Sequence, residues 1–325
     1  MGDVSAVVVT YNARPHVEGC LASVRELETI VVDNGSTDGT VEFVRARFPD
    51  AAVVEQENRG LAAGWNTGLR RTSGRYVLLL NADAWVVGDA VARLVAFADA
   101  HSDAGTVGPR LRNVDGSLQR SVRGFPTLWR LATEYLFLRK LAPRSNALNA
   151  FYAAGFGHDS VREAEVVMGA CMLVRREAAE SVGLVDEDFF MFSEEVDLAY
   201  RFRHAGWKTY FFPGAEAVHV GGASHGGRLF TENVRGHLRF LAKHRGGAEA
   251  ERARRLLVIA LRLRGAVFPG ARGRMYRDAA RQLASRRGRK HVSPANPLLC
   301  RGVDSGARKP LGGPSPPSAA DRARG

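Results

Sequence analysis

The chain has 325 residues, of which 45% are hydrophobic and 25% are charged, and its net charge is +12. This length allows one large domain or two ordinary ones, and the composition excludes a wholly disordered chain, a collagen-like repeat and a disulfide scaffold. Three widely spaced cysteines fit a reducing compartment, and the apolar runs are too short to span a bilayer. We therefore expect a cytoplasmic protein.

The positive charge is concentrated near the C-terminus. Residues 246–325 contain 18 Lys and Arg against 5 Asp and Glu, whereas residues 1–245 contain 28 against 29. The sequence thus predicts a neutral domain over 1–245 and a basic extension over 246–325, helical at first and largely disordered from about residue 269. Such an asymmetry suggests contact with an anionic membrane or a nucleic acid.

The N-terminal third alternates short apolar strands with helices. Strands are predicted at residues 4–10, 29–32, 52–55 and 76–80, and helices at 15–27, 40–48 and 61–71. This alternation indicates βαβ units, an α/β fold class and a mostly parallel central sheet with flanking helices. Each strand ends in polar residues, and ligands of such sheets bind beyond the carboxyl ends of the strands.

The rest of the chain has a weaker pattern. Residues 108–165 are predicted to be irregular, apart from a wide apolar face with basic residues at 127–141. We predict a buried strand at 166–174, an acidic cluster and then a helix within 189–203, short strands at 210–213 and 217–220, and a basic helix at 249–263.

Acidic residues after the strands could carry chemistry. Asp83 follows the fourth strand, where a carboxylate can hold Mg²⁺ or Mn²⁺ beside a diphosphate, or simply form a turn. Asp33 ends the second strand and could contact a nucleobase, stabilise an Asx-turn, or do both. The strongest signal is the group of Glu194, Glu195 and Asp197 among aromatic residues. Negative charges this close raise one another's pKa, as in many catalytic sites. The alternative is a solvated helix start, which also favours acidic residues.

Eight segments occur in the order in which one known family has them: residues 8–12, 31–39, 58–60, 64–66, 80–83, 169–176, 194–197 and 218–222, within about residues 4–245. Through these segments the sequence resembles the family 2 inverting glycosyltransferases of the GT-A fold, most closely their bacterial rhamnosyltransferase-like branch. The resemblance implies a GT-A nucleotide-diphospho-sugar transferase fold for that region. It also implies inverting transfer of a sugar from dTDP-rhamnose or a UDP-sugar to a hydroxyl of a glycan or lipid-linked glycan in cell-envelope polysaccharide synthesis.

The resemblance also implies a role for individual residues. It assigns Glu195 as the general base and Asp83 with His219 as ligands of Mg²⁺ or Mn²⁺. The donor nucleotide would be contacted by Thr10, Tyr11, Asn12, Asp33, Asn58, Gly60 and Asn81, and the acceptor side would include Glu194, Asp197 and Trp65.

Three features depart from the family pattern. The metal motif reads Asn81-Ala82-Asp83 instead of Asp-x-Asp, which leaves Asp83 as its only charged ligand. The base position is often Asp in the family and is Glu195 here, which is one methylene longer. The connection between the first helix and the second strand is several residues shorter than usual, but it contains no proposed site residue.

Two other classes of protein remain as alternatives. A nucleotidyltransferase usually has a Gly-rich, Arg-containing loop after its first strand, and here that place holds residues 11–14 (YNAR). A nucleic-acid-binding protein could use the basic extension, but its arginines have few aromatic residues between them.

Two basic apolar segments could place the protein at a membrane. Residues 128–141 and 252–268 combine large apolar side chains with arginines, a pattern typical of helices that lie at a lipid interface. We expect peripheral association with the inner face of the plasma membrane. The alternative is that both helices pack on the catalytic domain and their arginines are merely solvated.

Overall fold

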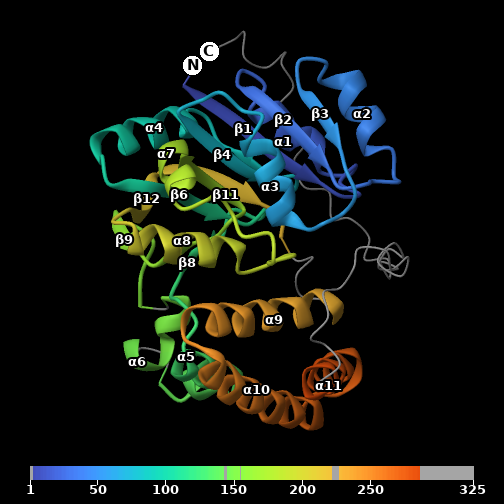
Figure 1. Cartoon of the computed structure of the whole chain (residues 1–325), viewed down its shortest axis with the longest axis vertical. Coiled ribbons are helices and arrows are strands. Elements are labelled where there is room, and N and C mark those ends of the chain that lie inside the picture. Colours follow the sequence, from blue (N-terminus) through green and yellow to red (C-terminus); the bar gives the residue numbers. More distant parts are fainter. Residues whose placement is uncertain (1–2, 143–144, 154, 222–226, 286–325) are drawn as a thin grey trace. The chain divides into compact units, whose positions relative to one another are not determined.

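The computed structural model describes residues 3–142, 145–153, 155–221 and 227–285 (Figure 1). They belong to one compact unit, residues 1–291, and a second unit, residues 292–325, lies outside the described ranges. Gly222 of the last matching motif and the disorder predicted beyond residue 285 also lie outside them.

Among the described residues, ten strands form one mixed sheet at the centre of the fold. Its main path runs β3–β2–β1–β4–β11–β6–β12–β5. The four strands β1 (Val4–Thr10), β2 (Glu28–Asp33), β3 (Ala52–Glu55) and β4 (Tyr76–Asn81) are parallel. The others are β5 (Ala84–Val86), β6 (Ala104–Arg112), β7 (Leu118–Gln119), β9 (Arg162–Ala164), β11 (Cys171–Arg175) and β12 (Lys208–His219); β8 (Val122–Arg123) and β10 (Val166–Val167) form a separate pair.

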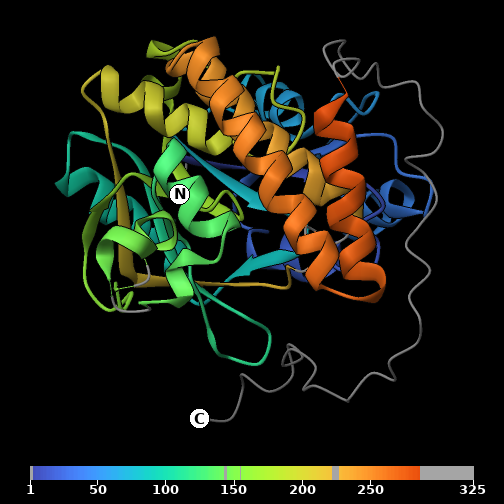
Figure 2. The same cartoon turned by 90° about the horizontal axis from the view of Figure 1, so that it is seen from below.

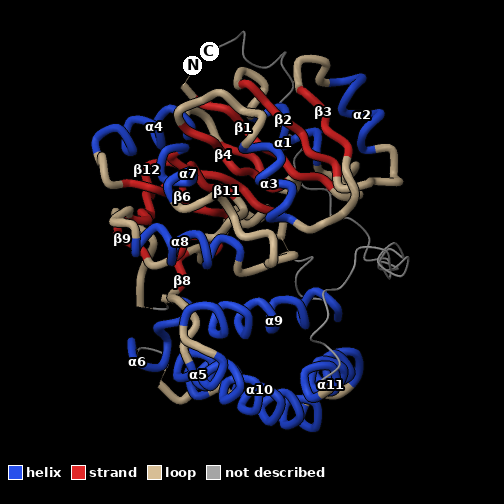
Figure 3. The backbone as a smooth tube through the Cα atoms, viewed as in Figure 1, coloured by secondary structure: helices blue, strands red, loops and turns tan. Residues whose placement is uncertain are grey.

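Helices cover both faces of the sheet, which explains why its inner strands are continuous apolar runs. On one face, α1 (Val17–Ser23), α2 (Thr40–Arg47) and α4 (Ala90–Ala100) pack on alternate residues of β1 and β4. On the other face, α3 (Leu61–Leu69), α7 (Arg176–Ser181) and α8 (Glu194–His204) pack on the intervening residues. The expected α/β architecture is confirmed, with helices (blue) against strands (red) in Figure 3.

A third apolar cluster is built from helices away from the sheet. It joins α5 (Leu128–Tyr135), α9 (Gly227–His244), α10 (Gly247–Val267) and α11 (Gly270–Ala284), with contributions from β10 and α8. Short turns lie beside α5: η1 (Leu138–Lys140), α6 (Asn146–Asn149) and η2 (Ala150–Tyr152). Figure 2 shows α5, α10 and α11 side by side, seen from below. Helices α10 and α11 share this cluster with α5 and α9, and the division at residue 245 stays a prediction from the charge distribution.

The central strands of the second half differ from their predictions. Residues 104–112 form β6 inside the sheet, although the irregular region was predicted from residue 108. Its Gly108 obscures the strand pattern, yet a Cβ at this position would lie 2.7 Å from Val167 Cβ, so the close packing with β10 requires glycine. The strand predicted at 166–174 is broken into β10 and β11, whereas the two strands predicted at 210–220 are one, β12, with an irregular register between Phe212 and Glu216.

The helical part of the basic extension is longer than predicted. The helix expected at 249–263 is α10, and α11 follows it where disorder was predicted from about residue 269. The Gly- and Arg-rich composition suggested disorder, but Tyr276, Ala279, Ala280 and Leu283 recur at helical spacing and are buried against the third cluster.

Candidate active site

Polar residues at the carboxyl ends of β1, β2 and β4 meet at one edge of the sheet. The parallel registers set Thr10 beside Asp33 and Val9 beside Asn81. Because the strand order changes direction at β1, the ends of β1 and β4 flank the position where ligands bind in doubly wound sheets. The structure therefore brings together Thr10, Tyr11, Asn12, Asp33 and Asn81.

The Asp33 carboxylate fixes the loop after β2. It is 1% exposed and accepts hydrogen bonds from the Thr10 hydroxyl (2.8 Å), the Ser36 hydroxyl (2.5 Å) and the N–H groups of Gly35 (3.0 Å) and Ser36 (2.7 Å). The expected Asx-type turn is present. A direct contact between Asp33 and a nucleobase stays a prediction.

Asn12 joins the loop after β1 to the loop after β2. Its backbone has a left-handed φ of 50°, its N–H donates to the Ser36 hydroxyl at 2.8 Å, and its side-chain oxygen accepts the N–H of Thr37 at 2.8 Å. Asparagine tolerates this conformation better than most residues. The two loops are thus held as one rigid edge.

Gly60 joins the loop predicted to contact the donor nucleotide to the loop that precedes α8. Asn58 accepts the N–H of Gly60 at 3.1 Å, and Gly60 has a φ of 98°. A Cβ on Gly60 would lie 2.1 Å from the carbonyl oxygen of Phe190, which also accepts the N–H of Leu61 at 2.7 Å. Only glycine allows this approach, so the loops containing Asn58 and Phe190 are positioned together.

Asp83 and His219 form a candidate metal site at the same edge. The antiparallel pairing of β5 and β12 sets His219 opposite Ala84, and this brings His219 Nε2 within 3.4 Å of Asp83 Oδ1. Burial acts to raise the pKa of Asp83, but hydrogen bonds from His219 and from the N–H of Gly221 outweigh it and lower the pKa. Asp83 is therefore a carboxylate at neutral pH.

The chemistry of this pair fits a divalent cation that is shared with a substrate. No group of three or more His, Cys, Asp or Glu side chains in the described part of the chain could hold an ion. Two protein ligands are enough when phosphate oxygens complete the coordination, as is usual for Mg²⁺. Asp83 and His219 would hold such an ion.

Gln119 of β7 orients the His219 ring. The Gln119 amide nitrogen faces the His219 carbonyl oxygen at 3.3 Å, so the amide oxygen is the atom that lies 2.8 Å from His219 Nδ1. A carbonyl-type oxygen can only accept, so Nδ1 carries a proton and donates it. Nε2, which donates to Asp83 when no ion is bound, is then the atom that gives up its proton to bind a metal.

Glu195 lies in a second part of the site, a pocket between β8, the start of α8 and α9. The pocket is lined by Arg123, Gly124, Pro126, Phe151, Phe192, Ser193, Glu195, Val196, Asn233 and His237. The Glu195 Oε2 atom is buried and accepts no hydrogen bond from the described residues. A carboxylate oxygen with no protein partner in a pocket is free to accept a proton from a bound hydroxyl.

The backbone before Glu195 is strained. Phe192 and Ser193 have left-handed φ values of 67° and 69°, which non-glycine residues adopt at a cost of about 1–3 kcal/mol each. Helix α9 holds this turn closely, since a Cβ on Gly236 would lie 2.7 Å from Ser193 Oγ and 2.8 Å from the Phe192 carbonyl oxygen. The turn points the first residues of α8 into the pocket.

Burial and one arginine set the protonation of the acidic pair. Burial raises the pKa of Glu195, and the nearby positive charge of Arg123 opposes this rise. Burial also raises the pKa of Glu194, and the charge of Glu195 raises it further. The predicted mutual effect of neighbouring carboxylates is thus present at Glu194, although burial is the larger cause.

The segment between β10 and β11 connects the two parts of the site. Glu195 Cβ is 3.6 Å from the position that a Cβ on Gly169 would occupy, and the next residue, Ala170, accepts the N–H of Asn81 at 2.9 Å. The base candidate and the end of β4 therefore lie on either side of one short segment.

Two residues expected on the acceptor side have other contacts. Asp197 is 0% exposed, and its carboxylate binds Arg201 Nε, Lys243 Nζ and His244 Nε2, each at 2.7 Å. Trp65 is also 0% exposed and packs in the apolar core beneath Gly169. These contacts make Asp197 an ion-pair centre between α8 and α9, and Trp65 a support for the Gly169 segment.

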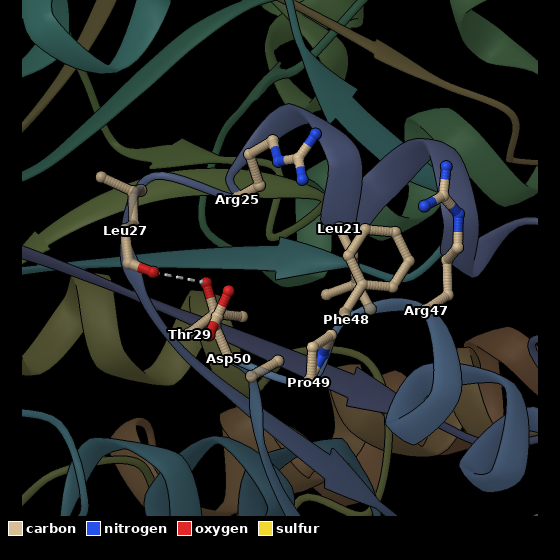
Figure 4. A pocket seen from close by; sticks show the side chains of 9 residues that line it. Leu21, Arg25, Leu27, Thr29, Arg47, Phe48, Pro49 and Asp50 are labelled. Atoms are coloured by element: carbon tan, nitrogen blue, oxygen red, sulfur yellow. Dashed lines mark hydrogen bonds between the residues drawn. The ribbon is translucent and has the colours of Figure 1, made fainter.

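A shallow hollow elsewhere lacks catalytic groups. It lies near the amino ends of β2 and β3 and is lined by residues of α1, α2 and the loops beside them (Figure 4). Thr29, at its base, donates its hydroxyl hydrogen to the Leu27 carbonyl at 3.1 Å. Because ligands bind at the carboxyl ends of such strands, this hollow is at the wrong edge for the nucleotide.

Comparison with known proteins identifies the family. The sequence profile described as Glycosyl transferase family 2 matches residues 5–183, a range that includes β2 to β4, nearly all of β1, and Asp83. The chain belongs to glycosyltransferase family 2. It is 35% identical over 241 residues to the Mycobacterium tuberculosis (strain H37Rv) N-acetylglucosaminyl-diphospho-decaprenol L-rhamnosyltransferase, an alignment that covers 67% of this chain and 76% of the relative.

This glycosyltransferase is also similar to a bacterial polysaccharide synthase. It is 27% identical over 220 residues to the poly-beta-1,6-N-acetyl-D-glucosamine synthase of Staphylococcus aureus (strain COL), covering 65% of this chain and 48% of the relative.

Solved structures show the same fold. The Pyrobaculum calidifontis mannosyltransferase PcManGT, solved with GDP-Man and Mn²⁺, matches with a TM-score of 0.52 and 21% identity over 88% of this chain and 81% of its own. GalNAc-T7, solved with UDP, GalNAc and Mn²⁺, matches with a TM-score of 0.54 and 17% identity over 73% of this chain, which spans 47% of that larger protein. The glycosyltransferase fold of the GT-A type is thus confirmed.

Sequence reasoning missed three residues of this glycosyltransferase site. They are Gln119 on β7, Arg123 on β8 and His237 on α9. The sequence has no recognisable motif at any of these elements. Arg123 and His237 line the Glu195 pocket only because the helical cluster packs beside α8. No local signal in the sequence could have identified them.

Proposed function

We propose that this glycosyltransferase transfers rhamnose from dTDP-rhamnose, or a hexose from a UDP-sugar, to a hydroxyl of a polyprenyl-diphosphate-linked glycan in cell-envelope polysaccharide synthesis. The 35% identical relative is named as an L-rhamnosyltransferase acting on N-acetylglucosaminyl-diphospho-decaprenol, which favours this donor and this class of acceptor. The observation that carries the proposal is the unpartnered Glu195 Oε2 in a pocket beside the end of β4.

The reaction is a single in-line displacement. Glu195 accepts the proton of the acceptor hydroxyl while the hydroxyl oxygen forms a bond to the anomeric carbon, and the bond from that carbon to the diphosphate oxygen breaks with its electron pair. The nucleoside diphosphate leaves with an additional negative charge, and the anomeric configuration inverts. The positive charge of Arg123 opposes the rise in the pKa of Glu195 that burial causes, which favours the ionised form that accepts the proton.

Mg²⁺ or Mn²⁺ is the proposed cofactor. When bound, such an ion neutralises the charge that develops on the leaving diphosphate. Asp83 and His219 are its proposed ligands, and Gln119 holds His219 in the tautomer that can bind it. Two structural neighbours were solved with Mn²⁺, which favours a divalent ion without deciding between the two metals.

The proposed acceptor requires access to a lipid surface. No helix in the described part of the chain is both long and apolar enough to cross a bilayer. We therefore propose peripheral association with the inner face of the plasma membrane as the way in which the enzyme reaches a lipid-linked acceptor.

A donor screen tests the proposed function. The full chain is incubated with a short-chain polyprenyl-diphosphate N-acetylglucosamine and, in turn, dTDP-rhamnose, UDP-galactose, UDP-glucose and UDP-N-acetylglucosamine, with Mn²⁺, Mg²⁺ or EDTA. Mass spectrometry should show a gain of one sugar on the acceptor with one donor, together with release of a nucleoside diphosphate, and EDTA should abolish it. Release of a sugar 1-phosphate instead would indicate nucleotidyl transfer, and no transfer with any donor would reject the proposed substrates.

A further inference from the structure

The outer face of α10 has an unusual composition for a surface helix. Ile259, Leu263 and Val267 are 58%, 56% and 74% exposed. Because residues four apart lie one turn apart on a helix, the three side chains form one stripe along its outer side. We call them the apolar stripe. A surface helix normally presents polar residues here, so the stripe calls for a partner.

The opposite side of α10 already has its partners. Leu257, Ala260, Leu261 and Gly265 are buried in the third apolar cluster. Arg264 is also buried: it donates to the carbonyl oxygens of Tyr135 (2.8 Å) and Glu134 (2.6 Å) at the end of α5. The inner face of α10 is therefore already packed against the cluster, and the stripe is a separate, outward-facing surface.

The end of α5 adds further apolar surface beside α10. Phe137 lies under the Arg264 guanidinium at 3.9 Å and 5.8 Å from the Phe268 ring, so the turn η1 adjoins the last turns of α10. Leu141, just after η1, is 80% exposed. The two segments predicted separately from the sequence thus meet at the end of α10.

Arginines surround the apolar stripe. Arg252, Arg255 and Arg262 are exposed on α10, and residues 252–284 contain nine arginines but a single acidic residue, Asp278. Glu251 forms ion pairs with both Arg254 and Arg255. One acidic side chain therefore faces two arginines, and the surface stays positive overall. Apolar side chains flanked by cations match a bilayer, whose acyl region accepts the former and whose anionic headgroups attract the latter.

We propose that the outer face of α10, with the adjoining η1 turn, docks on the anionic surface of a lipid bilayer. A second copy of this chain fits this face poorly, because a two-fold interface would bring two arginine-rich surfaces together. The proposal goes beyond the proposed reaction and needs neither donor nor acceptor. It explains how α10 and α11 serve an enzyme whose candidate active site they do not line.

Liposome co-sedimentation of the full chain tests this docking. Vesicles of phosphatidylcholine alone are compared with vesicles containing 30% phosphatidylglycerol, in low and high salt. The test variant is Ile259→Glu/Leu263→Glu, and a version with serine at both positions removes the apolar contact without adding charge. The control is Val114→Glu in the turn between β6 and β7, where the native side chain is 63% exposed and far from α10 in sequence.

The wild type and Val114→Glu should bind the anionic vesicles, and binding should weaken with salt. Both stripe variants should bind at least about tenfold less tightly, with unchanged melting temperatures, because the replaced side chains are exposed. Equal binding by wild type and stripe variants would overturn the proposal, as would absence of binding by the wild type.

Light scattering tests the other occupant of this face. A wild-type dimer that becomes a monomer in the stripe variants, without lipid binding, would overturn the proposal and make this face an interface between copies. Sugar transfer is measured separately, so failure of the proposed function leaves this result intact.

Discussion

His219 Nε2 lies 3.4 Å from Asp83 Oδ1, although the two residues come from distant parts of the chain. The contact depends on β5, a strand of three residues that pairs with the end of β12 and sets His219 opposite Ala84. Val220 reinforces it by donating its N–H to the Asp83 carbonyl at 2.9 Å. The carboxylate and the imidazole are therefore positioned by backbone pairing before any ion binds.

Replacing Gln119 should weaken metal binding. In Gln119→Leu, the His219 ring loses the acceptor that fixes its tautomer, and loss of such a partner typically costs about 10–100-fold in metal affinity. Titration of Mn²⁺ followed by electron paramagnetic resonance, in the presence of the nucleoside diphosphate, measures this directly. Gln282→Leu on α11 is the control and should bind Mn²⁺ normally; equal affinity in both variants would show that Gln119 does not orient His219.

Removing Arg123 should shift the pH dependence of catalysis. Burial raises the pKa of Glu195 and Arg123 opposes the rise, so Arg123→Met should raise the pKa further. A general base acts when it is deprotonated, and the acidic limb of the kcat/KM profile should therefore move to higher pH. Arg71→Met, between the end of α3 and the start of β4, should leave the limb in place. An unchanged limb in Arg123→Met would separate Arg123 from the base.

Asp197 should matter for stability. Its buried carboxylate holds Arg201, Lys243 and His244, and removal of one partner from a buried ion pair is strongly destabilising. We expect Asp197→Asn to lower the free energy of unfolding by about 3 kcal/mol, the lower end of the usual range, because Lys243 and Arg201 keep some contact with water. Asp278→Asn, which breaks an exposed pair with Arg281, should cost less than about 1 kcal/mol. Urea unfolding compares the two, and similar losses would contradict the assigned role.

His237 should make the protein less stable in mild acid. Burial lowers its pKa in the folded state to about 3, and Arg123 adds to this effect. Its contribution to stability is complete above the unfolded pKa of about 6.5 and is lost as the pH falls towards the folded value. Between pH 7 and pH 5 this amounts to about 2 kcal/mol at a single site. His237→Gln should show a correspondingly smaller drop in the free energy of unfolding over that range; an identical drop would mean that His237 is not buried in its neutral form.

The sequence was sufficient for the parts of the fold that are locally encoded. The aliphatic runs of β1 and β4 and the polar residues that end them predicted the sheet and its ligand-binding edge, because parallel strands place their carboxyl ends together. The cluster of three carboxylates in four positions drew attention to Glu195, which the structure places in the pocket beside Arg123 and His237.

Other features depend on long-range packing that leaves no local pattern. Strand β6 contains glycine and proline and is specified by its neighbours β11 and β12. Gln119 and Arg123 lie on strands of two residues, which carry no detectable periodicity. The sequence predicted Asp197 on the acceptor side, which stays a prediction. Only the packing of α9 against α8 shows that Lys243 and His244 bind the Asp197 carboxylate.

The most direct test of the proposed mechanism is the behaviour of Glu195→Gln. This change keeps the size of the side chain and removes its ability to accept a proton. We predict that kcat falls by about 10²–10⁴, the usual contribution of a general base, while donor affinity measured by calorimetry stays within about twofold, because Glu195 lies in the pocket away from the loops that hold Asp33 and Asn12. A variant that loses donor affinity but keeps its kcat would contradict the account and make Glu195 part of the nucleotide site.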